Sequence, residues 1–563
     1  MLRVPFMRAK TGRSVLLLFP LLVGSLVFAG APGSACPSSG ESDESDESTT
    51  PLEASATRVS STETAILFER LGARRHRITT RSALAQRYFD QGLALTYAFN
   101  DGEAIRSFEE AARLDPSCAM AYWGIALALG PSINQAMLQE AVPKARRAIE
   151  EARKRAPLVT DKERAYIEAL ASRYSHATSA VPAPRDYADA MRDLHARYPD
   201  DSDAATLFAA ALMEVHPWQW WRNERPTPEV EEAIGVLEAV LEREPLHLGA
   251  NHYHIHALET APEPLRALPS ADRLRDLAPQ AGHLLHMPSH IYLRAGLWND
   301  ASRSNADAIR TDRAFVARRG YASHYVQFYY PHNINWFVFS TLMEGRSAES
   351  LAMARMIADE VKRGHIDTTE LLALPMFVRV RFACWDDILA EAAPPSTEPV
   401  VRLVWHYARG MAYAARGELE QARRESKQVE ELAMSDPAGL VAHDVLEAEI
   451  SRRRGALEPA IERLEAAVER AASLGLVPLP RWYYPVRQSL GAALLEAGRA
   501  SEAERVFRQD LEQYPANGWG LFGLARSLEA QGRESEAASV GRAFRAAWIR
   551  ADVELGPTGV VRR

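Results

Sequence analysis

Histidine is the residue type whose placement in this sequence points most clearly to chemistry. Nine of the 16 histidines lie between His247 and His332. Two of these, His252 and His256, stand four residues apart, and Glu259 follows three residues later. On a helix, all three side chains share one face. Two imidazoles at this spacing can bind one metal ion, and a carboxylate one turn further on can complete the set of ligands.

A second pair of histidines repeats the pattern of the first. His286 and His290 follow the first pair by 34 residues each, which is the length of a common helical repeat. The offset predicts that the two pairs occupy equivalent places on neighbouring helices, where their side chains converge and where His332 could join them from the next helix. Pro288 lies inside the second pair. Because proline is tolerated only in the first turn of a helix, we expect a helix to begin near Met287.

These residues are the candidate ligands of a metal site. Imidazole and carboxylate together suit a divalent transition metal such as zinc, iron, copper or manganese. The alternative interpretation is that the histidines pack against aromatic side chains and hydrogen-bond to the backbone in a polar groove. The sequence contains no HExxH motif, so an ordinary zinc protease site is not predicted. The six candidates are His252, His256, Glu259, His286, His290 and His332.

Other sequence motifs of catalysis are missing or weak. The chain contains no P-loop, no GxSxG and no CxxC. Its GxGxxG string at Gly518, Gly520 and Gly523 follows no predicted strand, so it is interpreted as a chance match rather than a nucleotide site. The sequence therefore assigns no catalytic residue and no site for an organic cofactor.

The elements that must position the histidines follow a 34-residue repeat. Small, aromatic and proline residues recur at the key positions of the tetratricopeptide (TPR) repeat. Small residues let the two helices of a pair approach closely, and the proline ends the second helix. We therefore predict an all-α fold, a right-handed TPR-like helical solenoid of antiparallel helix pairs. The key positions are Gly92, Ala104, Phe108, Ala111 and Pro116 in the first repeat, and Gly491, Ala503, Phe507 and Pro515 in a later one.

The chain is predicted to divide into an export region and two stretches of the array. A basic start, an apolar run and small residues have the order of a signal peptide. Cys36 stands where a bacterial lipoprotein carries its lipid, so the protein is expected in the periplasm, free after ordinary cleavage or anchored through Cys36. The predicted parts are a signal peptide (1–35), a disordered acidic Ser-rich spacer (36–80), an irregular TPR-like array carrying the histidines (81–390), regular TPR repeats (400–552) and a frayed tail (553–563).

Composition and charge exclude several classes of protein. The chain has 563 residues, of which 47% are hydrophobic and 25% charged. These values are close to the average of soluble globular proteins and unlike those of a collagen or a multi-span membrane protein. Its 66 Lys and Arg against 74 Asp and Glu give a net charge of −8, so no basic surplus argues for a nucleic-acid partner. Three cysteines are too few for a disulfide framework.

Several phrases of the sequence resemble a known family. They are similar to recurring phrases of the bacterial TPR-repeat proteins related to eukaryotic tetratricopeptide-repeat protein 38. The resemblance covers about residues 81–400 and implies the helical repeat fold rather than an activity. In one place the chain departs from the family, which often has a histidine after Phe-Asn where this chain has Asp101. The phrases are RSFEEAARLDPSCAMAYWGIALALGPSIN (106–134), HYHIHALE (252–259), GHLLHMPSHIYLRAGLW (282–298) and YYPHN (329–333).

Three functions are compatible with the sequence. The first is an exported scaffold that binds a protein or peptide partner in the concave groove of the solenoid. This is the main prediction, and it rests on fold class. The second is a metal-dependent enzyme, hydrolytic or oxidative, that uses the histidines and Glu259. The third is a metal-binding accessory protein with the same ligands. No nucleic-acid partner is predicted, and a membrane only through the lipid on Cys36.

Overall fold

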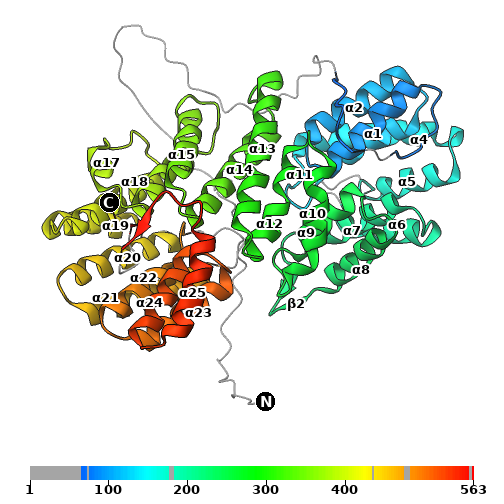
Figure 1. Cartoon of the computed structure of the whole chain (residues 1–563). Coiled ribbons are helices and arrows are strands. Elements are labelled where there is room, and N and C mark those ends of the chain that lie inside the picture. Colours follow the sequence, from blue (N-terminus) through cyan, green and yellow to red (C-terminus); the bar gives the residue numbers. More distant parts are fainter. Residues whose placement is uncertain are drawn as a thin grey trace, which may run out of the picture. The chain divides into compact units, whose positions relative to one another are not determined.

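The computed structural model describes residues 65–72, 75–175, 183–433, 436–474, 482–556 and 561–562. The predicted signal peptide, Cys36 and most of the predicted spacer lie outside these residues. The described chain is an all-α array in which antiparallel helix pairs follow one another (Figure 1). The predicted TPR-like helical fold is therefore confirmed.

The first helices of the array run through residue 243, blue to cyan in Figure 1. Their ends carry the expected capping residues, since Ser82 and Asn100 accept hydrogen bonds from the first turns of α1 and α2. The helices are α1 (Ala83–Tyr97), α2 (Asp101–Leu114), α3 (Ala119–Ala128), α4 (Val142–Arg155), α5 (Asp161–Ser172), α6 (Pro184–Arg197), α7 (Ser202–Val215) and α8 (Pro228–Arg243).

The middle of the array carries the histidines and is green in Figure 1. Its helices vary in length, from the 5 residues of α11 to the 22 of α13. They are α9 (Leu248–Leu258), α10 (Leu268–Leu277), α11 (Gly282–His286), α12 (Pro288–Arg294), α13 (Trp298–Arg319), α14 (His324–Met343), α15 (Ser347–Lys362), α16 (Leu374–Arg381) and α17 (Trp385–Ala390).

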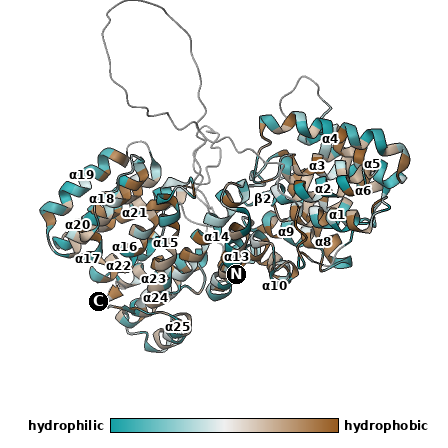
Figure 2. Cartoon of the chain, turned by 90° about the horizontal axis from the view of Figure 1, so that it is seen from above, coloured by the Kyte–Doolittle hydropathy of each residue, from teal (hydrophilic) through white to brown (hydrophobic). Residues whose placement is uncertain are grey.

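The last eight helices form the most regular pairs. Figure 2 shows hydrophilic and hydrophobic residues alternating along single helices such as α19, as expected of helices that bury one face. Glycines with positive φ end the first helix of several pairs, among them Gly417 (80°) and Gly498 (74°). The helices are α18 (Pro399–Ala415), α19 (Leu419–Ala433), α20 (Pro437–Arg453), α21 (Leu457–Ser473), α22 (Val486–Glu496), α23 (Ala500–Gln513), α24 (Gly518–Ala530) and α25 (Glu534–Ala547).

Glycines facing a phenylalanine explain how the helices approach one another. A Cβ atom added at Gly491 or Gly523 would lie 2.4 or 2.2 Å from the ring of Phe507, which is far too close. Gly92 and Gly124 face Phe108 in the same way, at 2.6 and 2.4 Å. One aromatic ring of a second helix thus fills the space that two flanking first helices leave open. Gly523 of the GxGxxG string has this packing role.

Two segments differ from the predicted boundaries. His76 and Thr79, assigned to the spacer, hydrogen-bond to the carboxylates of Asp203 and Glu163, so the ordered chain begins before residue 81. Buried carboxylates elsewhere in the chain supply these partners, and composition does not reveal them. In the predicted tail, β3 (Glu554–Leu555) pairs with β4 (Val561–Arg562), and the pairing satisfies backbone groups that a frayed end would leave to water. A second strand pair joins β1 (Trp221–Arg222) to β2 (Arg225–Pro226).

Two further observations concern the described residues. No helix among them combines the length and the apolar character that crossing a membrane requires. Cys118 and Cys384 are both buried, and no disulfide joins them.

Candidate metal centre

Four helices of the middle region bring six histidines together. α9 contacts α12, and α11 contacts α14. The predicted helix boundary is present: α12 begins with Pro288 in its first turn, directly after Met287. All of the candidate histidines lie in this layer, together with His283 of α11, which the sequence reasoning did not select. Five of the six are buried, and His332 is half-buried.

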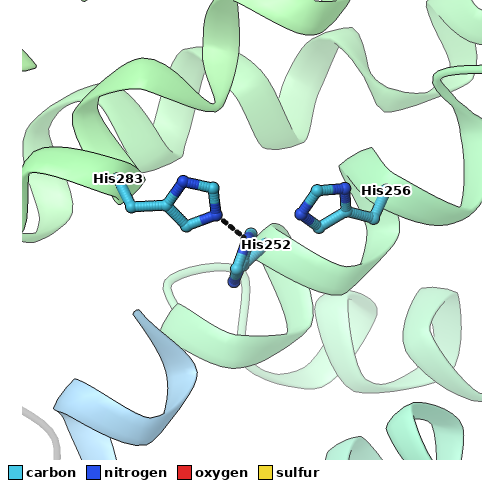
Figure 3. Close-up of side chains that lie close together, drawn as sticks. All are labelled: His252, His256 and His283. Carbon is cyan, nitrogen blue, oxygen red and sulfur yellow. Dashed lines mark hydrogen bonds between the residues drawn. The ribbon is translucent and has the colours of Figure 1, made fainter. Parts of the chain in front are cut away.

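The histidines form two groups of three rather than one site. The α9 group consists of His252, His256 and His283, whose side chains point toward one another in Figure 3. The α12 group consists of His286, His290 and His332. Within each group, the ligand atoms lie within 4.8 Å of one another. The sequence predicted that the two HxxxH pairs converge on one site. In the structure each pair instead belongs to its own group of three histidines.

Glu259 has a different role from the predicted one. Its carboxylate, which is fully buried, accepts a hydrogen bond from Nδ1 of His256 at 2.6 Å and another from Nδ1 of His290. Burial by itself raises the pKa of Glu259, but the adjacent His290 and His256 lower it to about 2, so the group is ionised. The glutamate therefore orients one histidine of each group through the ring nitrogen that faces away from the group, as carboxylates do behind metal-binding histidines.

Hydrogen bonds determine the tautomers in the α12 group. Asn305 donates from Nδ2 to the carbonyl of Ala301 at 2.8 Å, so its Oδ1 is the acceptor for Nδ1 of His286, at 2.6 Å. Nδ1 of His290 donates to Glu259. A neutral imidazole whose Nδ1 carries the proton has a lone pair on Nε2, and this is the state of His286, whose pKa burial holds well below its usual value.

The Nε2 atoms of His286 and His290 face each other. They are 2.8 Å apart, and Nε2 of His332 is 3.1 Å from that of His286. Two acceptor atoms at this distance in a buried place repel each other unless a proton or a metal ion lies between them. The arrangement is therefore typical of a site that holds a cation.

In the α9 group, hydrogen bonds orient His252 and His256, while Nδ1 of His283 has no partner among the described residues. Nδ1 of His252 donates to the carbonyl of Tyr97 at 2.6 Å, which leaves a lone pair on its Nε2, 3.1 Å from Nε2 of His283. Nδ1 of His256 is used by Glu259, and its Nε2 is buried with no hydrogen-bond partner among the described residues. A buried polar atom without a partner is uncommon and calls for a ligand or an ion.

Burial keeps these histidines neutral. It is the largest cause that lowers the pKa of His252, His283 and His286 well below the usual value, with neighbouring histidines adding to it. Burial, with the neighbouring His290, lowers the pKa of His332 to about 3. Neutral imidazole is the form that binds metal, so His252, His283, His286 and His332 are in that form at pH 7.

Aromatic side chains enclose both groups. The ring of Phe99 lies 4.6 Å from that of His252 and 5.3 Å from that of His283, and the ring of Trp336 lies 4.1 Å from that of His290. Phe99 belongs to the turn between α1 and α2 and has a φ of 56°, the left-handed region that bulky residues avoid. Strained residues of this kind concentrate at functional sites. The rings keep water away from the nitrogens.

A second polar cluster supports the α9 group. Asp203 accepts hydrogen bonds from Tyr97 (2.9 Å), His247 (3.1 Å) and His76 (2.8 Å). Burial raises the pKa of Asp203, but the hydrogen bonds of the two histidines dominate and bring it well below the usual value. The cluster holds the ring of Tyr97, whose carbonyl orients His252.

The sequence reasoning missed residues for two different reasons. His283 stands three residues before His286, so its spacing was a usable signal. The carbonyl of Tyr97 and the amide of Asn305 carry no such signal, because only tertiary packing brings them to His252 and His286.

Comparisons with known proteins add little to this geometry. No protein-family model matches the chain, and no curated protein matches it significantly. Similar solved structures include Naa15/Naa10 bound to HypK-THB (13% identity, 83% of this chain and 74% of that chain, TM-score 0.23) and the human IFIT1 dimer with m7Gppp-AAAA (12%, 84% and 91%, 0.30). A third is the APC/C hetero-tetramer Cut9-Hcn1 (15%, 80% and 78%, 0.26). TM-scores this low carry no argument, so the TPR-like assignment rests on the helix pairs of this chain itself.

Proposed function

We propose that this chain is a helical repeat protein that binds a divalent transition metal in its histidine layer. The observation that carries the proposal is the gathering of six imidazoles in two groups, within each of which the ligand atoms lie within 4.8 Å of one another. The Nε2 atoms of His286 and His290 are 2.8 Å apart, and a bound metal ion or a shared proton would satisfy both. Nε2 of His256 is buried with no hydrogen-bond partner among the described residues.

The six imidazoles would hold the metal, and Glu259 would orient two of them. Three imidazoles leave one position of a four-coordinate ion open, which is the mark of catalytic rather than structural zinc sites. A zinc ion bound there would activate water, and iron or copper would support oxygen chemistry. A metal-dependent enzyme, hydrolytic or oxidative, is thus the activity that this donor set suits. A metal-binding accessory protein would use the same residues without turnover.

The main prediction from the sequence, a scaffold that binds a protein or peptide in its groove, is the alternative function. It rests on the surfaces that a repeat array offers. Its supporting observation is the array of helix pairs itself, and it makes no use of the buried histidines. Membership of the family related to tetratricopeptide-repeat protein 38 is proposed on the shared phrases quoted above.

Metal content tests the proposal. We expect stoichiometric zinc, iron, copper or manganese in protein purified without a histidine tag, and its loss from the His252→Ala/His290→Ala double variant, which removes one imidazole from each group. His254→Ala is the matched control. His254 lies on α9 and is equally buried, but its Nδ1 pairs with Ser270 and it belongs to neither group. Protein that contains no metal after both aerobic and anaerobic purification, or a folded double variant that keeps its metal, would overturn the proposal.

Export with a lipid anchor on Cys36 is proposed from the order of segments in residues 1–36. Fractionation of the producing bacterium tests it. We expect the protein in the membrane fraction and its release to the soluble periplasmic fraction by Cys36→Ala. Membrane association that Cys36→Ala leaves unchanged would contradict a lipid anchor.

A further inference from the structure

We infer that the histidine layer binds two metal ions, one in the α9 group and one in the α12 group, with Glu259 as their shared carboxylate. The inference rests on the proposed function and adds the number of ions and the assignment of each ligand. The ions it concerns are those that prefer imidazole, such as zinc, copper and iron.

Each group is a complete set of ligands by itself. Three imidazoles and one open position make the coordination of a mononuclear catalytic site. The α9 group draws its donors from α9 and α11, and the α12 group draws its donors from α11, α12 and α14. α11 divides its two histidines between the groups, since His283 belongs to the first and His286 to the second. Their rings are stacked with centroids 5.8 Å apart.

Glu259 hydrogen-bonds to one histidine of each group. His256 and His290 turn their Nδ1 atoms toward the two oxygens of this one carboxylate. On an imidazole ring Nε2 points away from the partner of Nδ1, so each of these Nε2 atoms faces its own group. Six nitrogens arranged in this way cannot all reach one ion at the usual 2.0–2.1 Å.

A buried carboxylate shared by two sites also predicts that the sites depend on each other. Hydrogen bonds from Nδ1 to a carboxylate fix ring orientation and raise the basicity of the ligand nitrogen. Replacing Glu259 with glutamine removes the negative charge that faces both groups. Such an outer partner is typically worth about 10–100-fold in metal affinity. The loss should therefore appear in both sites, although each site keeps its three nitrogens.

The test counts zinc ions bound by the full chain after chelation and reloading with zinc alone. We expect two ions in the wild type, one in His283→Ala, one in His332→Ala, and two in the control His254→Ala. Glu259→Gln should still reach two ions at saturation, with both affinities lowered about 10–100-fold. If a variant still binds one ion, its histidine layer is folded, because the remaining site forms only in the folded chain. Circular dichroism checks the fold of each variant. If an alanine variant unfolds, His283→Gln or His332→Gln takes its place.

The outcomes separate this inference from the proposed function. One ion in the wild type, lost in both single variants, would mean one shared site and would overturn the two-ion inference while leaving metal binding in place. No ion in the wild type would overturn both. A folded single-histidine variant that keeps two ions, or an effect of Glu259→Gln on one site alone, would also contradict the inference.

Discussion

The middle of the array and its C-terminal part pack helices in the same way but bury different side chains. In α18–α25, alanine, leucine and valine fill the spaces between helices, and Phe507 lies between Gly491 and Gly523. In α9–α14, histidines, Asn305 and Glu259 are buried among the apolar side chains, nearly all with less than 5% exposure.

The C-terminal region shows that helix pairs of this kind form without buried histidines. The C-terminal pairs form the same architecture from apolar side chains, which bury without a desolvation cost. Burying polar groups costs free energy unless each is hydrogen-bonded. Hydrogen bonds satisfy the Nδ1 atoms of His252, His256, His286 and His290, whereas Nδ1 of His283 and Nε2 of His256 have no partner among the described residues. Unsatisfied nitrogens of this kind support the proposed metal site.

The largest expected effect lies in the apolar region. Phe507→Ala should lower the free energy of unfolding by about 3–5 kcal/mol, because it removes a buried ring and leaves a cavity between two glycines. Chemical denaturation followed by circular dichroism measures the change. The same variant should keep the metal content of the wild type, and a loss of metal would show that the two regions are not independent.

The next prediction concerns the stabilisation of the protein by zinc, which should depend on the histidine layer and not on the C-terminal helices. Zinc at about 100 times its dissociation constant should stabilise the wild type by about 2.7 kcal/mol for each ion bound, because it binds only the folded histidine layer. The stabilisation should persist in Phe507→Ala and vanish in the His252→Ala/His290→Ala variant, which has lost one ligand from each group. Thermal denaturation with and without a chelator gives the measurement. Equal stabilisation of both variants would place the binding outside the layer.

A smaller effect is expected from Glu259 in metal-free protein. Glu259→Gln should cost about 1–3 kcal/mol at pH 7, since the amide cannot accept protons from both His256 and His290. The pKa of Glu259 is lowered to about 2 in the folded protein, so its stabilisation is complete above the pKa of the unfolded chain, about 4.3. It is lost as the pH falls toward 2. The difference between wild type and variant, measured by denaturation at several pH values, should therefore shrink on acidification, and a constant difference would contradict the assignment.

The smallest effect concerns a turn of the regular region. Gly417 has a φ of 80°, and nothing lies within 4 Å of a Cβ placed there. Gly417→Ala should therefore cost only the strain of a left-handed alanine, about 1–2 kcal/mol, with no change in metal content. Denaturation curves and metal analysis of the same sample provide the check. A cost well above this range would mean that the turn makes contacts beyond its backbone conformation.

Much of the fold could be predicted from spacing alone. Glycine at a fixed distance before phenylalanine predicted the helix pairs, and Gly92 with Phe108 packs accordingly. Pro288 predicted the beginning of α12 for a local reason, since its ring fits only the first turn of a helix. The pairing of His76 with Asp203 was not predictable, because 127 residues separate them and neither residue type specifies the partner.

The sequence predicted most residues of the candidate site, but it did not predict how they are arranged. The 34-residue offset between the HxxxH pairs predicted equivalent places on neighbouring helices, because one repeat length returns the chain to an equivalent place, but in the structure the two pairs belong to two separate groups. Spacing along one helix also suggested Glu259 as a ligand. In the folded chain its carboxylate instead accepts protons from His256 and His290, and His290 comes from another repeat.

By itself, the sequence determined that this chain is a helical array and that its histidines gather on neighbouring helices. Both properties follow from periodicity, which is a local feature of the chain. Only the tertiary structure decided which nitrogen of each imidazole is free, and that the histidines divide into two groups with one carboxylate between them. Those properties depend on hydrogen bonds from distant partners such as Tyr97 and Asn305, and a linear pattern cannot encode where such partners come to lie.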